Sequence, residues 1–521
     1  MRDQPAWQQR SDAFRAATTP GGRALNRRGF LVGTGALLGL GLAPAPARAA
    51  ATPHWRPAVH FTPARNWMND PNGLVHHDGE YHLFFQHNPE STAHANLSWG
   101  HAVSTDLVRW QELDVALRPD ELGEVYSGSA VVDHQDTSGF FDGGAGLVAI
   151  YTSAGETQQQ SIAHSADRGR TWTKYEGNPV IPNPGVEDFR DPKVFWHGRS
   201  AQWILLLAAG DRIVFYGSSN LQEWHRLSEF GAAEGAHGGV WECPDLVELP
   251  VDGDPADTRW VLVVSINPGG PAGGSATQYF LGDFDGTTFS AQGPADGVRW
   301  AERGADFYAP QSFSDVPAAD GRRLWIGWLS NWDYAEQVPT DPWRGAMTVP
   351  RQVGLTATAS GVLLTQQPVA ELESRRAGVR RWRGVVGESA PEFTGTALDV
   401  VAEFRLGTAS AFGFDVFSGG GRRTRVGYDA DAGELFVDRT QSGSAPVGPT
   451  FPARHGTPLD PAGEVLRIRL LADRCCVEVF GDRGQAVLTD LVLPDAGADR
   501  LCLFSAGGRV EVISLEVHEL A

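Results

Sequence analysis

An internal repeat is the feature that most constrains how this chain can fold. Five units share one order: a polar, aromatic-rich start, a short strand, a turn and a more apolar strand. Their starts are 57, 64, 51 and 66 residues apart, at Asp70, Ser127, Asp191, Glu242 and Tyr308. A recurring period of this length predicts a five-bladed β-propeller of antiparallel strands. A sandwich of many hairpins is the alternative, but it does not explain why similar residues open every unit.

A propeller would bring distant acidic residues together. The innermost strand of each blade lines the central channel, so the five strand starts converge on one mouth. Asp70, Asp191 and Glu242 each open a unit, and a proline follows each of them within two residues. Proline restricts the backbone on both sides of its nitrogen. An isolated Asp-Pro pair is usually a simple turn, but three acids at equivalent positions predict a shared pocket.

The pattern changes after Pro350. Residues 367–374 are a short helix candidate, and short alternating apolar segments follow from about Arg380. These segments are residues 398–404, 412–417, 435–437, 465–471, 476–480, 486–491, 501–504 and 510–518. Alternation in many short segments is typical of a β-sandwich. We therefore predict an all-β chain: a five-bladed propeller that carries the three acids at 51–366, a linker at 367–379, and a β-sandwich at 380–521. The sandwich is interpreted as mostly structural, and sugar contact is the minor alternative.

Residues 1–50 have the order of an export signal. Residues 27–31 (Arg-Arg-Gly-Phe-Leu) form a twin-arginine pattern, a weakly apolar run continues to Leu42, and residues 47–49 (Ala-Arg-Ala) resemble a cleavage site. The run is too short and too rich in glycine to span a membrane as a helix. We predict a twin-arginine signal peptide and a secreted protein, either extracellular or periplasmic. A disordered tail is the alternative.

Charge and composition exclude several classes of function. The chain has 521 residues and a formal net charge of −20 at pH 7. Such an acidic surface repels phosphate groups, so neither nucleic acid nor an anionic membrane is expected as a partner. Four cysteines are too few for a disulfide framework, and no spacing of cysteine or histidine matches a metal site. We expect no metal and no other cofactor, and the oligomeric state stays open.

The residue types near the three acids suit a polyhydroxyl ligand, because aromatic rings stack on the C–H faces of sugars while polar groups bind their hydroxyls. Cleavage of a glycosidic bond needs two carboxyl groups with separate roles. One is ionised at the anomeric carbon, and the other gives a proton to the leaving oxygen. Glu242 has the longer side chain and is the candidate proton donor. Asp191, beside Arg190, is expected to stay ionised and to hold sugar hydroxyls.

Three motifs resemble those of glycoside hydrolase family 32: residues 67–73 (WMNDPNG), 189–192 (FRDP) and 241–244 (WECP). The resemblance covers roughly residues 58–521 and matches in order and spacing. That family includes invertases, levanases, inulinases and fructosyltransferases. The resemblance implies a retaining mechanism in which Asp70 is the nucleophile, Glu242 the acid/base and Asp191 the transition-state stabiliser. It also implies a separation of about 5–5.5 Å between the Asp70 and Glu242 carboxyls.

The same resemblance implies a set of sugar-binding residues. They are Asn69, Gln86, Trp99, Ser127, Arg190 and Trp332. One local departure is residues 96–98 (Asn-Leu-Ser) before Trp99, where many members of the family have Met-His. Cys243 is expected to be a packed neighbour of Glu242 and not a nucleophile, because no histidine lies at a motif position. Trp110, Trp172 and Trp224 are expected in the blade cores.

The expected substrate is a fructan or a fructo-oligosaccharide, cleaved as by a levanase or an exo-inulinase. A levan fructotransferase, which closes two fructose units into a dianhydride, needs the same three acids and is a serious alternative. A non-catalytic fructan-binding protein is a distant one, because it predicts a missing acid. A propeller glycosidase for another sugar, such as arabinan, is disfavoured by the opening motif at residues 69–73. The sequence leaves linkage preference and exo or endo action open.

Overall fold

The computed structural model describes residues 54–293, 297–387, 390–461 and 463–521. The predicted signal peptide at residues 1–50 lies outside the described residues. Within these ranges the chain is almost entirely β-strand, and its helical segments are the 3₁₀ helices η1 (Ala335–Gln337) and η2 (Ala370–Arg375). No helix in the described part of the chain is long and apolar enough to cross a membrane.

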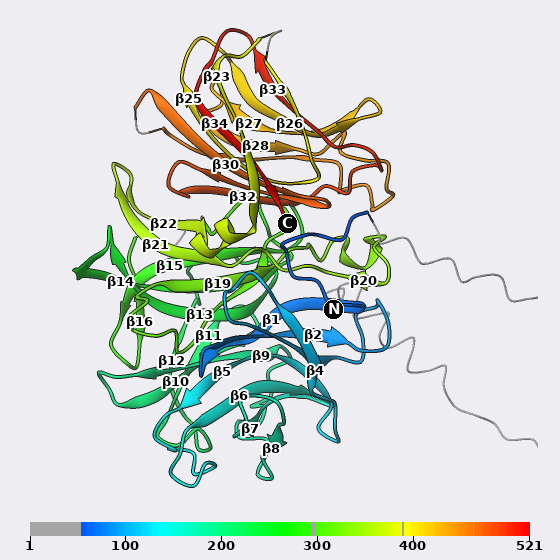
Figure 1. The fold of residues 1–521 in the computed structure, drawn as a ribbon. Coiled ribbons are helices and arrows are strands. Elements are labelled where there is room, and N and C mark those ends of the chain that lie inside the picture. The colour runs from blue at the N-terminus through cyan, green and yellow to red at the C-terminus, as the bar shows by residue number, and fades with distance from the viewer. Residues whose placement is uncertain (1–53, 294–296, 388–389, 462) are drawn as a thin grey trace, which may run out of the picture. The chain divides into compact units, whose positions relative to one another are not determined.

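Three separate antiparallel sheets come first along the chain (Figure 1). The first consists of β1 (Asn66–His77), β2 (Glu80–Asn88), β3 (Ser98–Ser104) and β4 (Gln111–Leu117). The second consists of β5 (Glu124–Asp133), β6 (Gly146–Ala154), β7 (Gln158–Ser165) and β8 (Thr173–Lys174). The third consists of β9 (Phe189–His197), β10 (Gln202–Ala209), β11 (Ile213–Ser218) and β12 (His225–Phe230).

The next two units share one larger sheet. The fourth consists of β13 (Val240–Val251), β14 (Asp254–Asn267), β15 (Ala276–Phe284), β16 (Phe289–Ala291) and β17 (Arg299–Trp300). The fifth consists of β18 (Tyr308–Ser312), β19 (Arg323–Trp328), β21 (Arg351–Thr358) and β22 (Gly361–Pro368). A parallel pair between Val251 and Leu355 joins them. Strand β20 (Trp343–Arg344) instead pairs with β1, which ties the last unit to the first.

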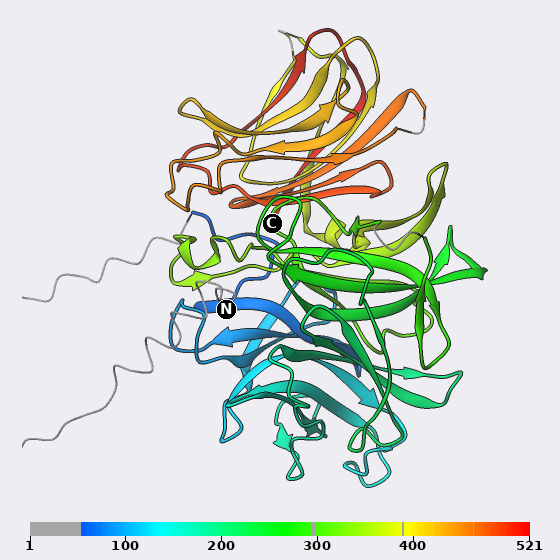
Figure 2. The same cartoon turned by 180° about the vertical axis from the view of Figure 1, so that it is seen from behind.

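The five units, or blades, form a closed ring. The first strands β1, β5, β9, β13 and β18 each contact the first strand of the next blade, and β18 contacts β1. Figures 1 and 2 show, from opposite sides, the blue to green strands of this propeller and the yellow to red strands of the C-terminal sheets. The predicted five-bladed propeller is confirmed, with the single difference that the fourth and fifth blades share a sheet.

The blades are apolar on both faces because each one packs between two others. All residues of β10 after its first are buried, although they run Trp-Ile-Leu-Leu-Leu-Ala-Ala without polar alternation. Ile204 and Leu206 pack towards β13 and β14 of the fourth blade, while Leu205 and Leu207 pack towards β5 and β6 of the second. Central strands covered on both sides thus become continuous apolar runs, which explains why the sequence units have such apolar second strands.

Each inner strand carries a β-bulge at the same place. In each bulge the inner strand has one residue more than its partner strand. The bulges lie at residues 68–71, 125–128, 190–193, 242–245 and 308–311. A bulge bends a strand and re-aims its side chains. The second bulge residue has positive φ in three blades: Asp191 (66°), Cys243 (47°) and Ala309 (50°). The repeated bulge thus sets the direction of the side chains at the mouth of the channel.

The C-terminal part is a sandwich of two six-stranded antiparallel sheets. One consists of β23 (Arg376–Val385), β34 (Glu511–Leu520), β25 (Ala397–Arg405), β30 (Val465–Asp473), β31 (Cys476–Gly481) and β32 (Ala486–Leu491). The other consists of β24 (Glu392–Thr394), β33 (Arg500–Ala506), β26 (Ala411–Gly419), β27 (Arg422–Asp429), β28 (Glu434–Asp438) and β29 (Arg454–Pro458). The predicted sandwich is confirmed.

A buried ionic network links residues of the propeller and the sandwich. His60 bonds through Nδ1 to Asp473 (2.8 Å) and through Nε2 to Glu478 (2.9 Å). Arg351 of β21 donates to Glu478 (2.7 Å), and it also donates to Glu302 (3.0 Å). All five side chains are almost completely buried. Because each charge has an opposite partner, this interface tolerates ions away from water.

Candidate active site

Three carboxyl groups from different blades meet at the mouth of the channel. Asp70 lies on β1, Asp191 on β9 and Glu242 on β13. Cys243 marks their meeting point, because its Sγ lies 3.5 Å from Oδ2 of Asp70 and 3.5 Å from Oδ2 of Asp191. Its backbone N–H donates to the same Asp191 oxygen at 3.0 Å. The structure therefore brings together the three acids that the repeat placed at equivalent positions.

Asp70 has one anchored and one unengaged oxygen. Ser127 Oγ donates to Oδ2 of Asp70 at 2.7 Å. The other oxygen, Oδ1, is buried and accepts no hydrogen bond within the described part of the chain. Buried carboxylate oxygens are normally hydrogen-bonded, so an unengaged oxygen within this cluster of acids is the arrangement expected of a nucleophile.

Glu242 is held through both of its oxygens. Arg190 donates to Oε1 from Nη2 at 2.9 Å and from Nε at 3.2 Å. The Tyr308 hydroxyl donates to Oε2. Burial, and then the charge of Glu242, raise the pKa of Tyr308 well above its ordinary value, so this hydroxyl keeps its proton and acts as a donor. The sequence placed Tyr308 at the start of the fifth unit, and this position was the available signal for its role beside Glu242.

The pKa of Asp191 is raised, although the sequence suggested that this carboxyl stays ionised. Burial raises its pKa to about 7, against the lowering effect of Arg190, and the charges of Glu242 and Asp70 add to the rise. Arg190 stabilises it less than its sequence position suggests, because the guanidinium turns to Glu242 and to Asp188 (2.5 Å). Its Nε is 4.0 Å from Asp191. Arg190 therefore contacts Glu242 and Asp188 more closely than it contacts Asp191.

The polar residues predicted to bind sugar lie around this cluster and are buried. Asn69 precedes Asp70 on β1, and its Oδ1 accepts a hydrogen bond from the Trp67 indole at 2.7 Å. Gln86 on β2 donates to the backbone carbonyl of Val125 at 3.1 Å, and its Oε1 accepts none within the described chain. Like Asp70, Gln86 thus keeps an acceptor oxygen unengaged.

The two predicted tryptophans occupy different environments. Trp99 is completely buried, donates its indole N–H to the Tyr126 carbonyl at 2.9 Å and packs against Phe84 and Tyr151. It therefore lies behind the pocket wall. Trp332 is partly exposed, and its ring stacks on that of Trp67 with centroids 6.0 Å apart.

His94 is a pocket residue that the sequence did not reveal. Its ring lies 5.6 Å from Trp67 and 4.9 Å from Trp332, measured between centroids. Burial lowers its pKa to about 4, although the charge of Asp70 acts in the opposite direction. The imidazole is therefore neutral above that pH, and it forms no hydrogen bond among the described residues. A lone histidine in a polar loop gives no sequence signal for this placement.

Cys243 is packed as expected. It is buried, and burial together with the charges of Asp191 and Asp70 raises the pKa of its thiol well above the ordinary value. A thiol that resists ionisation is a poor nucleophile. Trp110, Trp172 and Trp224 are partly buried against the hydrophobic cores and away from the acids.

Two family models together match most of the chain. A model of the glycosyl hydrolases family 32 N-terminal domain matches residues 60–368, and a model of the family's C-terminal domain matches residues 370–519. A levanase of Bacillus subtilis is 52% identical over 89% of this chain and 70% of its own length. A levanase of another Bacillus strain is 41% identical over 90% of this chain, which spans about half (52%) of that relative's length.

A fungal relative matches in both sequence and structure. The extracellular exo-inulinase of Aspergillus awamori is 40% identical over 90% of this chain and 95% of its own length. A crystal structure of exo-inulinase from the same organism superposes with a TM-score of 0.83 and 38% identity, covering 90% of this chain and 98% of that one.

Proposed function

The chain belongs to glycosyl hydrolase family 32, and on that premise we propose that it hydrolyses the β-fructofuranosidic bonds of fructans with retention of configuration. The observation that carries this proposal is the meeting of three carboxyls at Cys243, where Oδ1 of Asp70 stays unengaged. Levanases among the relatives favour levan as the polymer.

In the first step, Asp70 Oδ1 attacks the anomeric carbon while the bond to the leaving oxygen breaks. Glu242 gives its proton to that oxygen, and a fructosyl ester of Asp70 results. Ser127 holds the other oxygen of Asp70 and so limits its rotation. Arg190 and Tyr308 hold the Glu242 carboxyl in position. In the second step, Glu242 removes a proton from water, which attacks the same carbon and releases Asp70.

The remaining residues bind the sugar in this proposal. Asp191 stabilises the transition state through the fructose hydroxyls, and substrate hydroxyls that donate to it favour its ionised form. The polar contacts come from Asn69, Gln86 and Arg190, and the stacking surface comes from Trp332. Trp99 supports the pocket wall from behind, consistent with its complete burial.

We also propose that residues 1–50 direct twin-arginine export and that the enzyme acts outside the cytoplasm. The name of the extracellular exo-inulinase relative supports secretion. The sequence suggested a propeller at 51–366, a linker at 367–379 and a sandwich at 380–521. Strand β22 ends at Pro368 and β23 begins at Arg376, so the segment between these strands is shorter than the suggested linker. The two family-model matches divide between residues 368 and 370, within this linker.

Product analysis tests the reaction. Levan, inulin and sucrose are incubated in parallel with the enzyme, and the products are separated by chromatography. Free fructose is expected, whereas a non-reducing cyclic disaccharide from levan would establish a fructotransferase. With methanol as acceptor, a retaining enzyme forms methyl β-fructofuranoside, and the α-anomer would contradict the mechanism.

Leaving-group dependence separates the roles of the two central acids. Asp70→Ala is expected to lose turnover on every substrate, because no ester can form. Glu242→Ala is expected to lose turnover on sucrose but to form the ester from a substrate whose leaving group needs no proton, such as a nitrophenyl fructoside. A burst of nitrophenol from Glu242→Ala and none from Asp70→Ala supports the assignment. Equal losses in both variants contradict it.

A further inference from the structure

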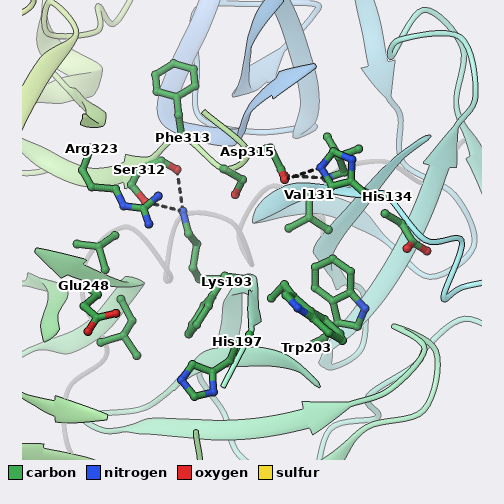
Figure 3. Close-up of a pocket in the computed structure, with 18 of the residues that line it drawn as sticks. Val131, His134, Lys193, His197, Trp203, Glu248, Ser312, Phe313, Asp315 and Arg323 are labelled. Atoms are coloured by element: carbon green, nitrogen blue, oxygen red, sulfur yellow. Dashed lines mark hydrogen bonds and ion pairs between the residues drawn. The ribbon is translucent and has the colours of Figure 1, made fainter. Parts of the chain in front are cut away.

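A second cavity opens at the other end of the same inner strands. It has a volume of about 540 Å³ and is lined by the later residues of β5, β9 and β13 and by the turn after β18 (Figure 3). On β9 the lining includes Lys193 and His197, which follow Asp191 along the strand, and on β13 it includes Glu248, which follows Glu242. The cavity therefore lies at the end of the channel opposite the three acids.

The channel between the two sites is filled. Lys193 is buried and points across the channel, where its Nζ donates to the Ser312 carbonyl at 2.8 Å (Figure 3). The same nitrogen lies 3.3 Å from Oδ2 of Asp245, which is also buried. A ligand in the second cavity therefore cannot extend through the propeller to the catalytic acids.

One wall of this second cavity is aromatic and partly open to solvent. Trp196 is 41% exposed, and it is the one aromatic residue among the large hydrophobic residues exposed on the described chain. Its ring meets Trp203 at 71°, with centroids 5.2 Å apart. Trp203 is fixed because its indole N–H donates to Thr137 Oγ1 at 2.9 Å. The exposed indole of Trp196 thus packs against a fixed side chain. Little conformational entropy is lost when a ligand binds to it.

The charges around the cavity are almost balanced. His134 pairs with Asp315 at 3.1 Å, and Arg199 pairs with Glu248 at 2.8 Å. The exposed side chain of Arg323 forms neither an ion pair nor a hydrogen bond with any described residue, and its guanidinium lies beside Ser312 in Figure 3. The carboxylates of Glu248 and Asp315 in the lining disfavour a polyanion. A neutral polyhydroxyl ligand fits better, since it can stack on Trp196 and take hydrogen bonds from Arg323.

We propose that this cavity is an auxiliary binding site for a segment of the fructan polymer, separate from the catalytic pocket. The identity of the sugar rests on the proposed function. Holding one part of a long chain raises the local concentration of its other parts near the active site. A disaccharide cannot occupy both sites, so the auxiliary site acts only on long substrates.

Kinetics with long and short substrates test the proposal. Trp196→Ala and Arg323→Gln are expected to raise KM for levan, by about tenfold for the loss of the indole surface. Their kcat/KM for sucrose is expected to stay within about twofold of the unmodified enzyme. Arg383→Gln is the matched control, because Arg383 is also exposed and without an ion pair on the described chain. Equal changes on sucrose and levan, or no change on either, overturn the proposal.

A binding measurement separates this site from catalysis. In native gels containing levan, Asp70→Ala is expected to be retarded, and adding Trp196→Ala is expected to reduce the retardation while adding Arg383→Gln does not. Excess sucrose in every gel competes for the catalytic pocket. If the enzyme cleaves neither sucrose nor levan, the proposed function fails, yet the gels still decide whether the cavity binds fructan. Retardation that Trp196→Ala leaves unchanged, or that dextran produces equally, overturns the proposal.

Discussion

At the scale of single residues, Tyr308 is the most informative addition to the predicted site. Its hydroxyl donates to the Glu242 oxygen that Arg190 does not contact. Removing a hydrogen bond to a charged group costs about 1.5–3 kcal/mol. We therefore expect Tyr308→Phe to lower kcat on sucrose by roughly 10- to 150-fold. Steady-state kinetics measures the loss, and an unchanged melting temperature shows that the fold is intact. A kcat within twofold of the unmodified enzyme would rule out this positioning role.

His94 permits a matched comparison at the same scale. The ring contacts Trp67 and Trp332, and it is neutral above pH 4 because burial lowers its pKa to about 4. His94→Phe keeps a ring and loses the nitrogens, whereas His94→Gln keeps a hydrogen-bonding group and loses the ring. If the imidazole binds a substrate hydroxyl, His94→Phe raises KM by roughly 2- to 13-fold, the value of one hydrogen bond, and His94→Gln restores part of it. The reverse order of the two KM values would assign the residue to packing.

At the scale of elements, the bulge repeated in the inner strands decides where the acids point. Pro71, Pro192 and Pro244 predicted a restricted backbone at three positions of the inner strands. Each of these prolines lies within one of the bulges. They did not predict left-handed φ at Asp191 and Cys243, because the residue before proline usually prefers an extended conformation. Neighbouring blades supply the compensation: Thr152 accepts the N–H of Asp191, and Asp191 accepts that of Cys243. These contacts are long-range, so sequence motifs could not show them.

The bulge of the fifth blade offers a test without touching an acid. Ala309 has φ of 50°, is completely buried, and donates its N–H to Ser265 Oγ at 3.0 Å. Ala309→Gly relieves the left-handed strain and is expected to change stability little. Ala309→Val places a β-branched residue there and is expected to cost about 1–3 kcal/mol of unfolding free energy. It should also lower kcat, because Tyr308 is its neighbour. Denaturant unfolding and sucrose kinetics measure both effects; equal stability of the two variants would contradict the strain argument.

At the scale of the whole molecule, repeats made the propeller predictable, and alternation made most of the sandwich predictable. The strands that the sequence did not reveal, such as β23 and β27, are rich in arginine, so their alternation is hidden by long side chains that reach solvent. The burial of Trp99 could not be predicted from the sequence either. Its motif position suggested sugar contact, but its complete burial follows from Phe84 and Tyr151 of two different blades. The local sequence pattern thus predicted most strands, but it did not predict the contacts between side chains of different blades.

The buried network between propeller and sandwich predicts how stability depends on pH. Pairing with Asp473 and Glu478 outweighs burial and raises the pKa of His60 from 6.5 to about 10. A group whose pKa is higher in the folded state contributes its full stabilisation below its unfolded value, here about 6.5, and loses it as the pH rises through 10. The pKa of both carboxyl groups is lowered, so their contribution is complete above their unfolded values. The pairing of His60 with these two carboxyls is therefore complete between about pH 4.5 and 6.5. Burial raises the pKa of Glu302, also in the network, to about 7, so its contribution is lost as the pH rises from 4.5 through 7.

Calorimetric melting temperatures across pH test this network. The unmodified protein is expected to lose stability steadily between pH 6.5 and 10. His60→Gln leaves the buried carboxylate of Asp473 without its cationic partner, whereas Glu478 keeps Arg351. Breaking a buried pair costs about 3–5 kcal/mol at pH 6, and the substitution removes most of the slope in that window. His225→Gln is the matched control, because His225 is exposed and has no ion pair among the described residues. Its profile should follow that of the unmodified protein. A His60→Gln profile that is lowered equally at pH 6 and pH 10 would mean that His60 acts through packing alone, because only a titrating charge gives a difference between the two.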